Sequence, residues 1–255
     1  MKISIVTISF NQKKYLRKCI DSILNQTECD LEYIVVDPGS NDGSRELIES
    51  YGNRIVTEFA PDNGPADGLN KGFKRATGQI YGFVNSDDYL LPGALKHIAD
   101  YFSTTGLNYF VTAKGFVQDP DGRLKKITPL PLTAENMIHR SAVMFQQGTF
   151  FPASAYEMAG GFNASNTTCW DYELLLRLLL KGVRNEVIEQ NVAVFRLHAD
   201  SISGSGRLTE RYLRDLDRLF FEVCGRERGL IDKIYTYFLR LKRELTHWRD
   251  TSDHA

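Results

Sequence analysis

The chain has 255 residues, of which 42% are hydrophobic and 25% are charged, and its formal net charge is -1. This composition predicts one sizeable core with an appendage, and the balanced charge gives no reason to expect a nucleic-acid partner. There is no run of eighteen apolar residues, and the N-terminus lacks the pattern of a signal peptide, so we expect a cytoplasmic protein without a spanning helix. The four cysteines are scattered without a Cys-x-x-Cys pair, which favours reduced thiols over a disulfide or zinc framework.

Short apolar runs alternate with segments of helical periodicity along the first half of the chain. The predicted strands are Lys2–Ser9, Leu31–Val36, Arg54–Glu58, Ile80–Val84, Tyr109–Asp119 and Leu124–Ile127. The predicted helices are Tyr15–Asn25, Arg45–Tyr51, Pro65–Ala76, Pro92–Phe102 and Asp171–Lys181. This order predicts an α/β fold with a mostly parallel sheet flanked by helices.

One predicted strand, Ile80–Val84, ends in the acidic cluster Asn85-Ser86-Asp87-Asp88. Carboxylates at the C-terminal tip of a strand are typical of a site for a hard divalent cation and the phosphates that it neutralises. The alternative interpretation is a solvated acidic turn. The surrounding motifs decide between the two.

Those motifs occur in the order found in nucleotide-diphospho-sugar glycosyltransferases of family 2, whose fold is called GT-A, and the chain resembles that family over residues 1–205. The matching segments are Ile3 to Asn11, Asp37-Pro38-Gly39-Ser40-Asn41-Asp42-Gly43-Ser44, Asn70-Lys71-Gly72, Ala76-Thr77-Gly78, Asn85-Ser86-Asp87 and Asp171 to Arg177. The resemblance implies a GT-A catalytic domain at 1–205 followed by a C-terminal helical extension at 206–255.

The resemblance also implies a metal site. Asp87 matches the second acid of the family's Asp-x-Asp motif and is expected to bind Mn or Mg, which bridges the two phosphates of the donor. Asp88 is a further expected ligand that would compensate for Asn85, which replaces the first acid and contributes no charge. His198 is another, because many members of the family place a histidine after an apolar strand here, where it completes the metal shell or contacts phosphate; the alternative is a satisfied surface histidine. Asn85 and Ser86 are expected to contact the donor instead.

A second set of residues is expected to bind the nucleotide sugar. By resemblance, Asp37 accepts a hydrogen bond from the N3 imide of uracil, which favours a UDP-sugar, and Thr7 lies near the same ring. An alternative for Asp37 is a turn carboxylate that binds neighbouring backbone amides. The other expected donor-binding residues are Asn11, Asn70, Lys71 as a phosphate neutraliser, and Gln147.

Asp171 is the expected catalytic base, because the family places an acid here that faces the acceptor hydroxyl. Its position at a helix N-terminus predicts a lowered pKa and an ionised carboxylate, although a simple N-cap would have the same position. Glu173 is expected behind Asp171 or at the surface. Trp170 could stack on a sugar or pack in the core.

The C-terminal segment differs from the rest, because residues 207–249 hold eleven Lys and Arg against seven Asp and Glu. The apolar residues Ile231, Ile234, Phe238, Leu241, Leu245 and Trp248 recur there at helical spacing among basic residues. Such a helix can lie on an anionic membrane surface at the inner face of the membrane, pack on the catalytic domain, or form the seam of a homo-oligomer.

The sequence therefore predicts an inverting, metal-dependent glycosyltransferase. It would move a sugar from a nucleoside diphosphate, UDP by preference, to a hydroxyl of a glycan or lipid-linked acceptor in surface polysaccharide synthesis. One alternative is a non-catalytic nucleotide-sugar-binding subunit, suggested by Asn85 and Leu69. A weaker one is a sugar-1-phosphate nucleotidylyltransferase, which would need a glycine-rich loop where Ser9 to Lys14 has none.

Overall fold

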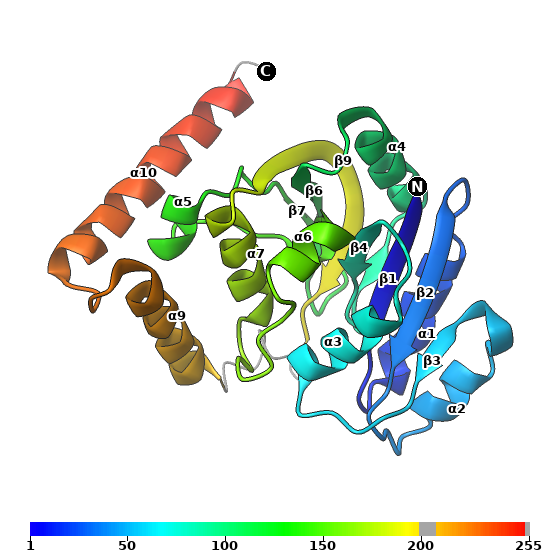
Figure 1. Ribbon diagram of the computed structural model, residues 1–255. Helices are drawn as coiled ribbons and strands as arrows, with labels where there is room; N and C mark the ends of the chain where they lie inside the picture. Colours follow the sequence, from blue (N-terminus) through cyan, green and yellow to red (C-terminus); the bar gives the residue numbers. More distant parts are fainter. Residues whose placement is uncertain (199–207, 253–255) are drawn as a thin grey trace.

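The computed structural model describes residues 1–198 and 208–252, with side chains up to residue 244, as one sheet with helices on both faces (Figure 1). The strands are β1 (Lys2–Ile8), β2 (Asp30–Val36), β3 (Val56–Glu58), β4 (Ile80–Phe83), β5 (Tyr89–Leu90), β6 (Tyr109–Gln118), β7 (Leu124–Ile127), β8 (Thr149–Pro152) and β9 (Arg184–Arg196). The helices are α1 (Lys13–Leu24), α2 (Ser44–Glu49), α3 (Pro65–Arg75), α4 (Ala94–Thr105), α5 (Ala134–Ile138), α6 (Ala153–Met158), α7 (Trp170–Leu180), α9 (Thr209–Cys224) and α10 (Leu230–Ser252).

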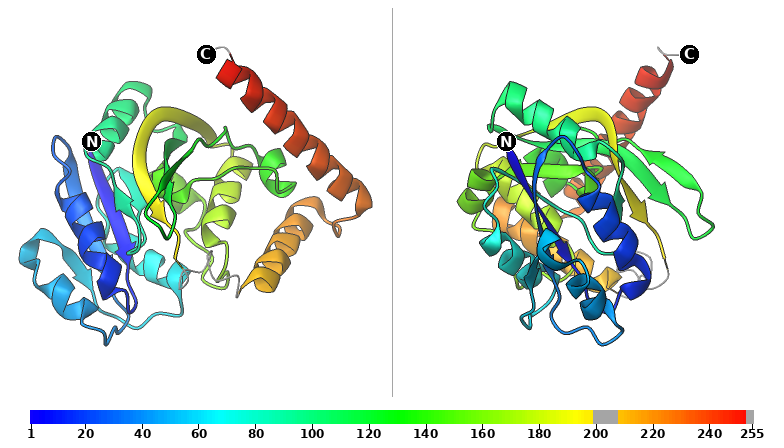
Figure 2. Two further views of the ribbon diagram at one scale, coloured as in Figure 1. Left: turned by 180° about the vertical axis from the view of Figure 1, so that it is seen from behind. Right: turned by 90° about the vertical axis from the view of Figure 1, so that its right-hand side faces the viewer.

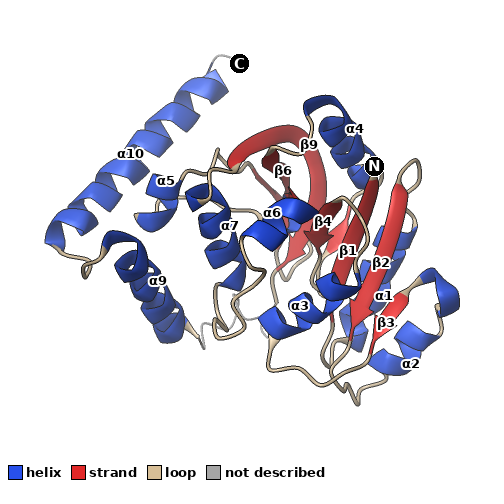
Figure 3. Ribbon diagram, viewed as in Figure 1, coloured by secondary structure: helices blue, strands red, loops and turns tan. Residues whose placement is uncertain are grey.

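The sheet has the strand order β3-β2-β1-β4-β8-β6-β9-β5, and β7 pairs with β6. The strands are drawn in red in Figure 3. Its first half, from β3 to β4, is parallel throughout. Val6 of β1 lies opposite Ile34 of β2 and Phe83 of β4, so the carboxyl ends of these strands meet at one edge of the sheet. This edge is where ligands bind in open α/β sheets.

The first half of the sheet is parallel, as predicted, and β6 and β9 also pair in parallel. In the second half β8 runs antiparallel to both β4 and β6, and β5 runs antiparallel to β9, so the whole sheet is mixed. The third strand is also shorter than predicted, because Gly52–Arg54 forms a 3-10 helix before β3 begins.

The long strand β9 curves across the molecule (Figure 1). It pairs in parallel with β6. The pairing register shifts on both sides of Lys114, which marks a β-bulge or a similar irregularity. Such irregularities bend strands. The bend carries the end of β9 to the acidic cluster, where the backbone amide of Arg196 donates to Asp88 Oδ1 at 2.9 Å.

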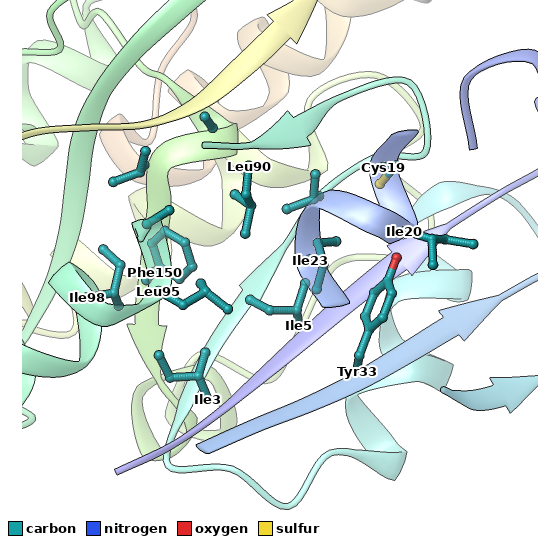
Figure 4. Close-up of a cluster of buried hydrophobic side chains, with 14 of the residues drawn as sticks. Ile3, Ile5, Cys19, Ile20, Ile23, Tyr33, Leu90, Leu95, Ile98 and Phe150 are labelled. Atoms are coloured by element: carbon teal, nitrogen blue, oxygen red, sulfur yellow. The ribbon is translucent and has the colours of Figure 1, made fainter. Parts of the chain in front are cut away.

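Two apolar clusters hold the helices to opposite faces of the sheet. Ile3 and Ile5 of β1 pack with α1 and α4 on one face (Figure 4), whereas Val6 packs with α3 and α7 on the other. The alternation along β1 is that of a strand buried on both faces. Helix α1 contributes Leu16, Cys19, Ile20 and Ile23, as its periodicity predicts.

Helices α9 and α10 lie at one side of the sheet and its other helices, and α10 extends past its neighbours (Figure 2). The predicted domain boundary at residues 205 and 206 lies outside the described residues. Across it, Arg218 of α9 forms an ion pair with Glu173 of α7, with an Nη2 to Oε2 distance of 2.5 Å. Among the described residues, no helix has the length and hydropathy needed to cross a membrane.

Candidate active site

A cavity of about 940 Å³ opens at the carboxyl ends of β1 and β4. Its walls come from the segments after these strands, from the segment before β8, from the start of α7 and from the end of β9. The predicted site residues that line it are Asn85, Ser86, Asp87, Gln147 and Asp171. The fold thus brings together a predicted metal ligand and the predicted base, although 84 residues separate them in the sequence.

Asp87 lines this cavity and contacts the imidazole of His198. Asp87 is 8% exposed, and its Oδ2 lies 3.0 Å from His198 Nε2. No group of three or more His, Cys, Asp or Glu side chains suited to a metal ion occurs in the described part of the chain. One carboxylate and one imidazole fit a Mn or Mg ion whose remaining ligands come from a diphosphate, rather than an ion held by protein alone.

Asp88 points away from the cavity, although it was also predicted to bind the metal. It is fully buried, and its carboxylate accepts hydrogen bonds from Gln147 Nε2 at 2.8 Å and from the backbone amide of Arg196 at 2.9 Å. Burial, followed by the nearby charge of Asp87, raises the pKa of Asp88 well above its usual value. This environment favours a structural role, in which Asp88 joins the end of β9 to the loop before β8.

Asn85, Ser86 and Gln147 lie along the cavity beside Asp87. Asn85 Nδ2 is 3.4 Å from Gln146 Oε1, and Asn85 Oδ1 is buried without a hydrogen-bond partner in the described structure. Ser86 Oγ donates to Gln12 Oε1. The amide of Asn85 therefore keeps an acceptor atom that no described residue satisfies.

Asp37 is buried at the end of β2, and its two carboxylate oxygens differ. Oδ1 accepts from the backbone amides of Gly39 at 2.9 Å and Ser40 at 2.8 Å, and it lies 3.3 Å from Arg45 Nη2. Oδ2 is buried and has no partner within the described chain. The turn role predicted as an alternative is thus present, and one oxygen remains for another donor.

Thr7 and Asn11, which were predicted to bind the nucleotide sugar, make contacts within the protein. Thr7 is fully buried and accepts a hydrogen bond from the hydroxyl of Tyr33 at 3.0 Å, whereas Ile8 is the first residue of β1 that lines the cavity. Asn11 adopts a left-handed backbone with φ of 54°, and its Oδ1 accepts from the amide of Asn41 at 2.9 Å. Asn11 thereby links the turns that follow β1 and β2.

Asn70 and Lys71 of α3 make contacts within the protein. Asn70 Oδ1 accepts from the backbone amide of Phe162 at 2.9 Å, and its Nδ2 donates to the carbonyl of the same residue at 2.9 Å. Lys71 Nζ lies 3.1 Å from a carboxylate oxygen of Asp67 and also donates to the carbonyl of Pro61. Neither residue lines the cavity in this conformation.

Asp171 stands in the first turn of α7 and lines the cavity. It is partly buried, and burial raises its pKa to about 6, although the backbone amide of Tyr172 donates to its Oδ1 at 2.9 Å and lowers the pKa. The sequence prediction of a lowered pKa is therefore wrong, because the loss of hydration outweighs the helix N-terminus. A carboxylate with this pKa is half-ionised near pH 6 and is suited to take up a proton.

Glu173 supports the segment that leads to Asp171. It is 4% exposed and accepts from Asn163 Nδ2 and Asn166 Nδ2, both at 2.8 Å, in addition to Arg218. Burial would raise the pKa of Glu173, but the hydrogen bonds from Arg218, Asn166 and Asn163 lower it. Asn166 Oδ1 in turn accepts from the amides of Thr168 and Cys169, so Glu173 fixes the loop before Asp171.

Several residues that were not predicted as site residues also line the cavity, and Phe10 and Asp62 are two of them. Phe10 is 60% exposed at the end of β1, and Asp62 accepts from the amide of Gly64 at 3.0 Å at the entrance to α3. An exposed aromatic residue directly after a buried strand was the available signal for Phe10. The Asp62-Asn63-Gly64-Pro65 turn was the corresponding signal for Asp62.

Known proteins resemble the chain in sequence and in fold. Residues 4–161 match the family model described as glycosyl transferase family 2. The chondroitin synthase of Pasteurella multocida is 30% identical over 187 residues, which is 69% of this chain and 18% of that protein. The putative teichuronic acid biosynthesis glycosyltransferase TuaG of Bacillus subtilis is 26% identical over 230 residues, covering 86% of this chain and 90% of TuaG.

A crystal structure of a Staphylococcus aureus TarS fragment in complex with UDP-GlcNAc superimposes with a TM-score of 0.72 at 19% identity, covering 94% of this chain and 70% of the fragment. This likeness confirms the predicted GT-A fold. The family match covers more than half of the chain. The chain belongs to glycosyl transferase family 2.

Proposed function

We propose that this protein is an inverting, metal-dependent glycosyltransferase that moves a sugar from a UDP-sugar to a hydroxyl group of a glycan or lipid-linked acceptor. The observation that carries the proposal is one cavity with the Asp87–His198 pair at the end of β4 and the weakly acidic Asp171 at the start of α7. Sugar transfer needs a cation beside the leaving diphosphate and a catalytic base beside the attacking hydroxyl.

The nucleotide binds where β1 and β2 end. Phe10 offers an exposed ring on which a base can stack, and Pro38 lines the same cavity. The free Oδ2 of Asp37 accepts from an N–H group of the base, such as the N3 imide of uracil. Cytosine has no hydrogen there, and the UDP-sugar in the TarS complex is in accord with this preference.

Asp87 and His198 would hold the divalent cation together with the diphosphate. A bound Mn or Mg ion offsets the negative charge that develops on the leaving diphosphate. The neutral Asn85 adds no charge beside Asp87, and its unsatisfied Oδ1 accepts from a hydroxyl of the ribose or of the donor sugar.

Asp171 removes the proton from the attacking hydroxyl. The proposed site uses one base and no carboxylate nucleophile. The reaction is therefore a single displacement that inverts the configuration at the anomeric carbon. Trp170 and Gln147 line the cavity beside it and frame the acceptor and the donor sugar. Glu173 holds the loop from Asn166 to Cys169 and so orients this side of the cavity.

The acceptor belongs to a surface polysaccharide in this proposal. Two relatives, a chondroitin synthase and a putative teichuronic acid biosynthesis glycosyltransferase, support this class. TuaG is the stronger support, because the similarity extends over most of both chains.

A panel of nucleotide sugars tests the proposal. We expect a UDP-sugar to raise the melting temperature in the presence of Mn and to be slowly hydrolysed, and we expect the variant Asp87→Ala to lose both effects. The matched control Asp121→Ala removes an exposed carboxylate in the β6–β7 turn and should behave as wild type. Stabilisation without transfer or hydrolysis for any donor would instead identify a non-catalytic nucleotide-sugar-binding subunit.

A further inference from the structure

The sheet holds the side-chain amide of Gln146 in one orientation. Gln146 lines the cavity, is 8% exposed and begins the 3-10 helix Gln146–Gly148 that precedes β8. Its Nε2 donates to the backbone carbonyl of Phe83 in β4 at 2.8 Å. Because a carbonyl oxygen only accepts, the NH2 group of Gln146 has to face Phe83, and its Oε1 has to face the other way.

The backbone of this short helix is also fixed. The ring of Phe145 is buried directly over Gly115 of β6 and over Gly148, and a Cβ atom at either glycine would overlap this ring. Such close packing leaves little room for the helix to shift. Gln146 therefore stays beside Phe83, and the position of its Oε1 is determined by the fold.

The fixed oxygen of Gln146 decides how the amide of Asn85 is turned. Asn85 Nδ2 lies 3.4 Å from Gln146 Oε1, whereas the opposite orientation would bring two acceptor oxygens together. Asn85 Oδ1 is the atom that remains, and it is buried without a hydrogen-bond partner among the described residues. A buried acceptor without a donor is costly, so this atom is suited to a donor group of a ligand in the cavity.

The same contact disfavours an acid at position 85. A carboxylate there would place an oxygen against Gln146 Oε1, and Gln146 could turn its NH2 group toward the carboxylate only by losing the bond to Phe83. This is a physical reason for the neutral amide that stands here in place of the first acid of the Asp-x-Asp motif.

We propose that Gln146 is a positioning residue of the donor site. It acts through Asn85, whose free Oδ1 it reserves for a hydroxyl group of the nucleotide sugar, and it excludes a carboxylate from position 85. The part in donor binding rests on the proposed function. The orientation of the two amides does not, because both are held by the protein alone.

A double-mutant cycle on the full chain tests the orientation without a ligand. The melting temperatures of wild type, Asn85→Asp, Gln146→Met and the double variant are measured without metal or nucleotide. Gln146→Met removes both polar atoms and keeps the length of the side chain. We expect Asn85→Asp to lower the melting temperature by at least about 3 °C more in the wild-type background than in the Gln146→Met background. Repulsion from Asp87 is present in both backgrounds and cancels.

Gln26→Met is the matched control. Gln26 is also buried, and its side chain bonds to backbone groups of Ser22, Leu91 and Leu95. Its effect should add to that of Asn85→Asp, since the cycle measures only residues in contact.

Gln146→Lys is a second variant that keeps a donor beside Phe83. Its ammonium group can donate both to the Phe83 carbonyl and to a carboxylate at position 85, so Asn85→Asp should cost the least stability in this background. If Asn85→Asp cost the same in the wild-type, Gln146→Met and Gln146→Lys backgrounds, the proposal would be overturned.

Donor binding provides the second readout. The UDP-sugar that stabilises wild type most is titrated in Mn, and we expect Gln146→Met to bind it at least about fivefold more weakly, because Asn85 then has to be ordered on binding. Gln26→Met should bind as wild type does. Unchanged affinity in Gln146→Met overturns the role in donor binding. A wild type that binds no nucleotide sugar contradicts the proposed function and this role together, while the melting temperatures still decide the orientation of the amides.

Discussion

Asp87 and Asp171 line the same cavity, and their surroundings differ. Asp87 follows a parallel strand and contacts the imidazole of His198 at 3.0 Å. Asp171 begins a helix, and burial raises its pKa to about 6. Two identical carboxylates thus acquire separate chemical roles from their neighbours. Asp87 is suited to bind a cation, and Asp171 is suited to accept a proton.

Removing the proton acceptor should have the largest effect. We expect Asp171→Asn to bind the donor as wild type does and to transfer the sugar about 10²- to 10⁴-fold more slowly, since general-base catalysis contributes that much. Rates of UDP release and donor affinities of both proteins provide the measurement. If Asp171→Asn turned over as fast as wild type, Asp171 would not be the catalytic base, and its role would no longer differ from that of Asp87 in the way proposed.

Removing the cation ligand should act on binding. We expect Asp87→Ala to weaken UDP binding in Mn by at least about tenfold, or 1.4 kcal/mol, and to change little in excess chelator. Titration calorimetry under the two conditions separates these cases. If binding fell equally in both, Asp87 would serve the fold and not a cation.

The smallest expected effect is that of Asp171→Asn on stability. This substitution should lower the activity but raise the stability of the folded protein at pH 8. Ionised Asp171 is disfavoured in the folded state, because its pKa is about 6 there against 3.8 for an ordinary aspartate. The cost is present above pH 6 and vanishes below 3.8, so Asp171→Asn should be the more stable protein at pH 8 but not at pH 3.5.

A rise of about 2–4 °C in melting temperature at pH 8 is expected, which corresponds to about 1 kcal/mol after allowing for solvent at the cavity wall. Asp121→Asn, at an exposed turn, is the control and should not change with pH in this way. A variant that is less stable than wild type at pH 8 would show that the carboxylate of Asp171 is not strained by burial.

The sequence predicted the strand ends well, because a short apolar strand followed by Asn85-Ser86-Asp87 is a local pattern. It could not predict which way each side chain turns. Thr7 and Asn70 stand in matching motifs, yet their polar atoms bind Tyr33 and Phe162 inside the protein.

Long-range pairing limited the rest of the prediction. Burial of Glu173 depends on Arg218, which lies 45 positions further along the chain. The raised pKa of Asp171 depends on how closely the walls of the cavity enclose it, and no local pattern carries that information. The short elements β8, α5 and α6 lacked enough periodic residues to be predicted.

The pH dependence of sugar transfer tests the division between the two carboxylates most directly. If Asp171 is the base, the wild-type rate at saturating donor falls about tenfold for each pH unit below an apparent pKa near 6 and levels off above it. The residual rate of Asp171→Asn should lack this titration, while Asp121→Asn should keep it. A wild-type rate that stays constant from pH 5 to 8, or an unchanged titration in Asp171→Asn, would contradict the assignment.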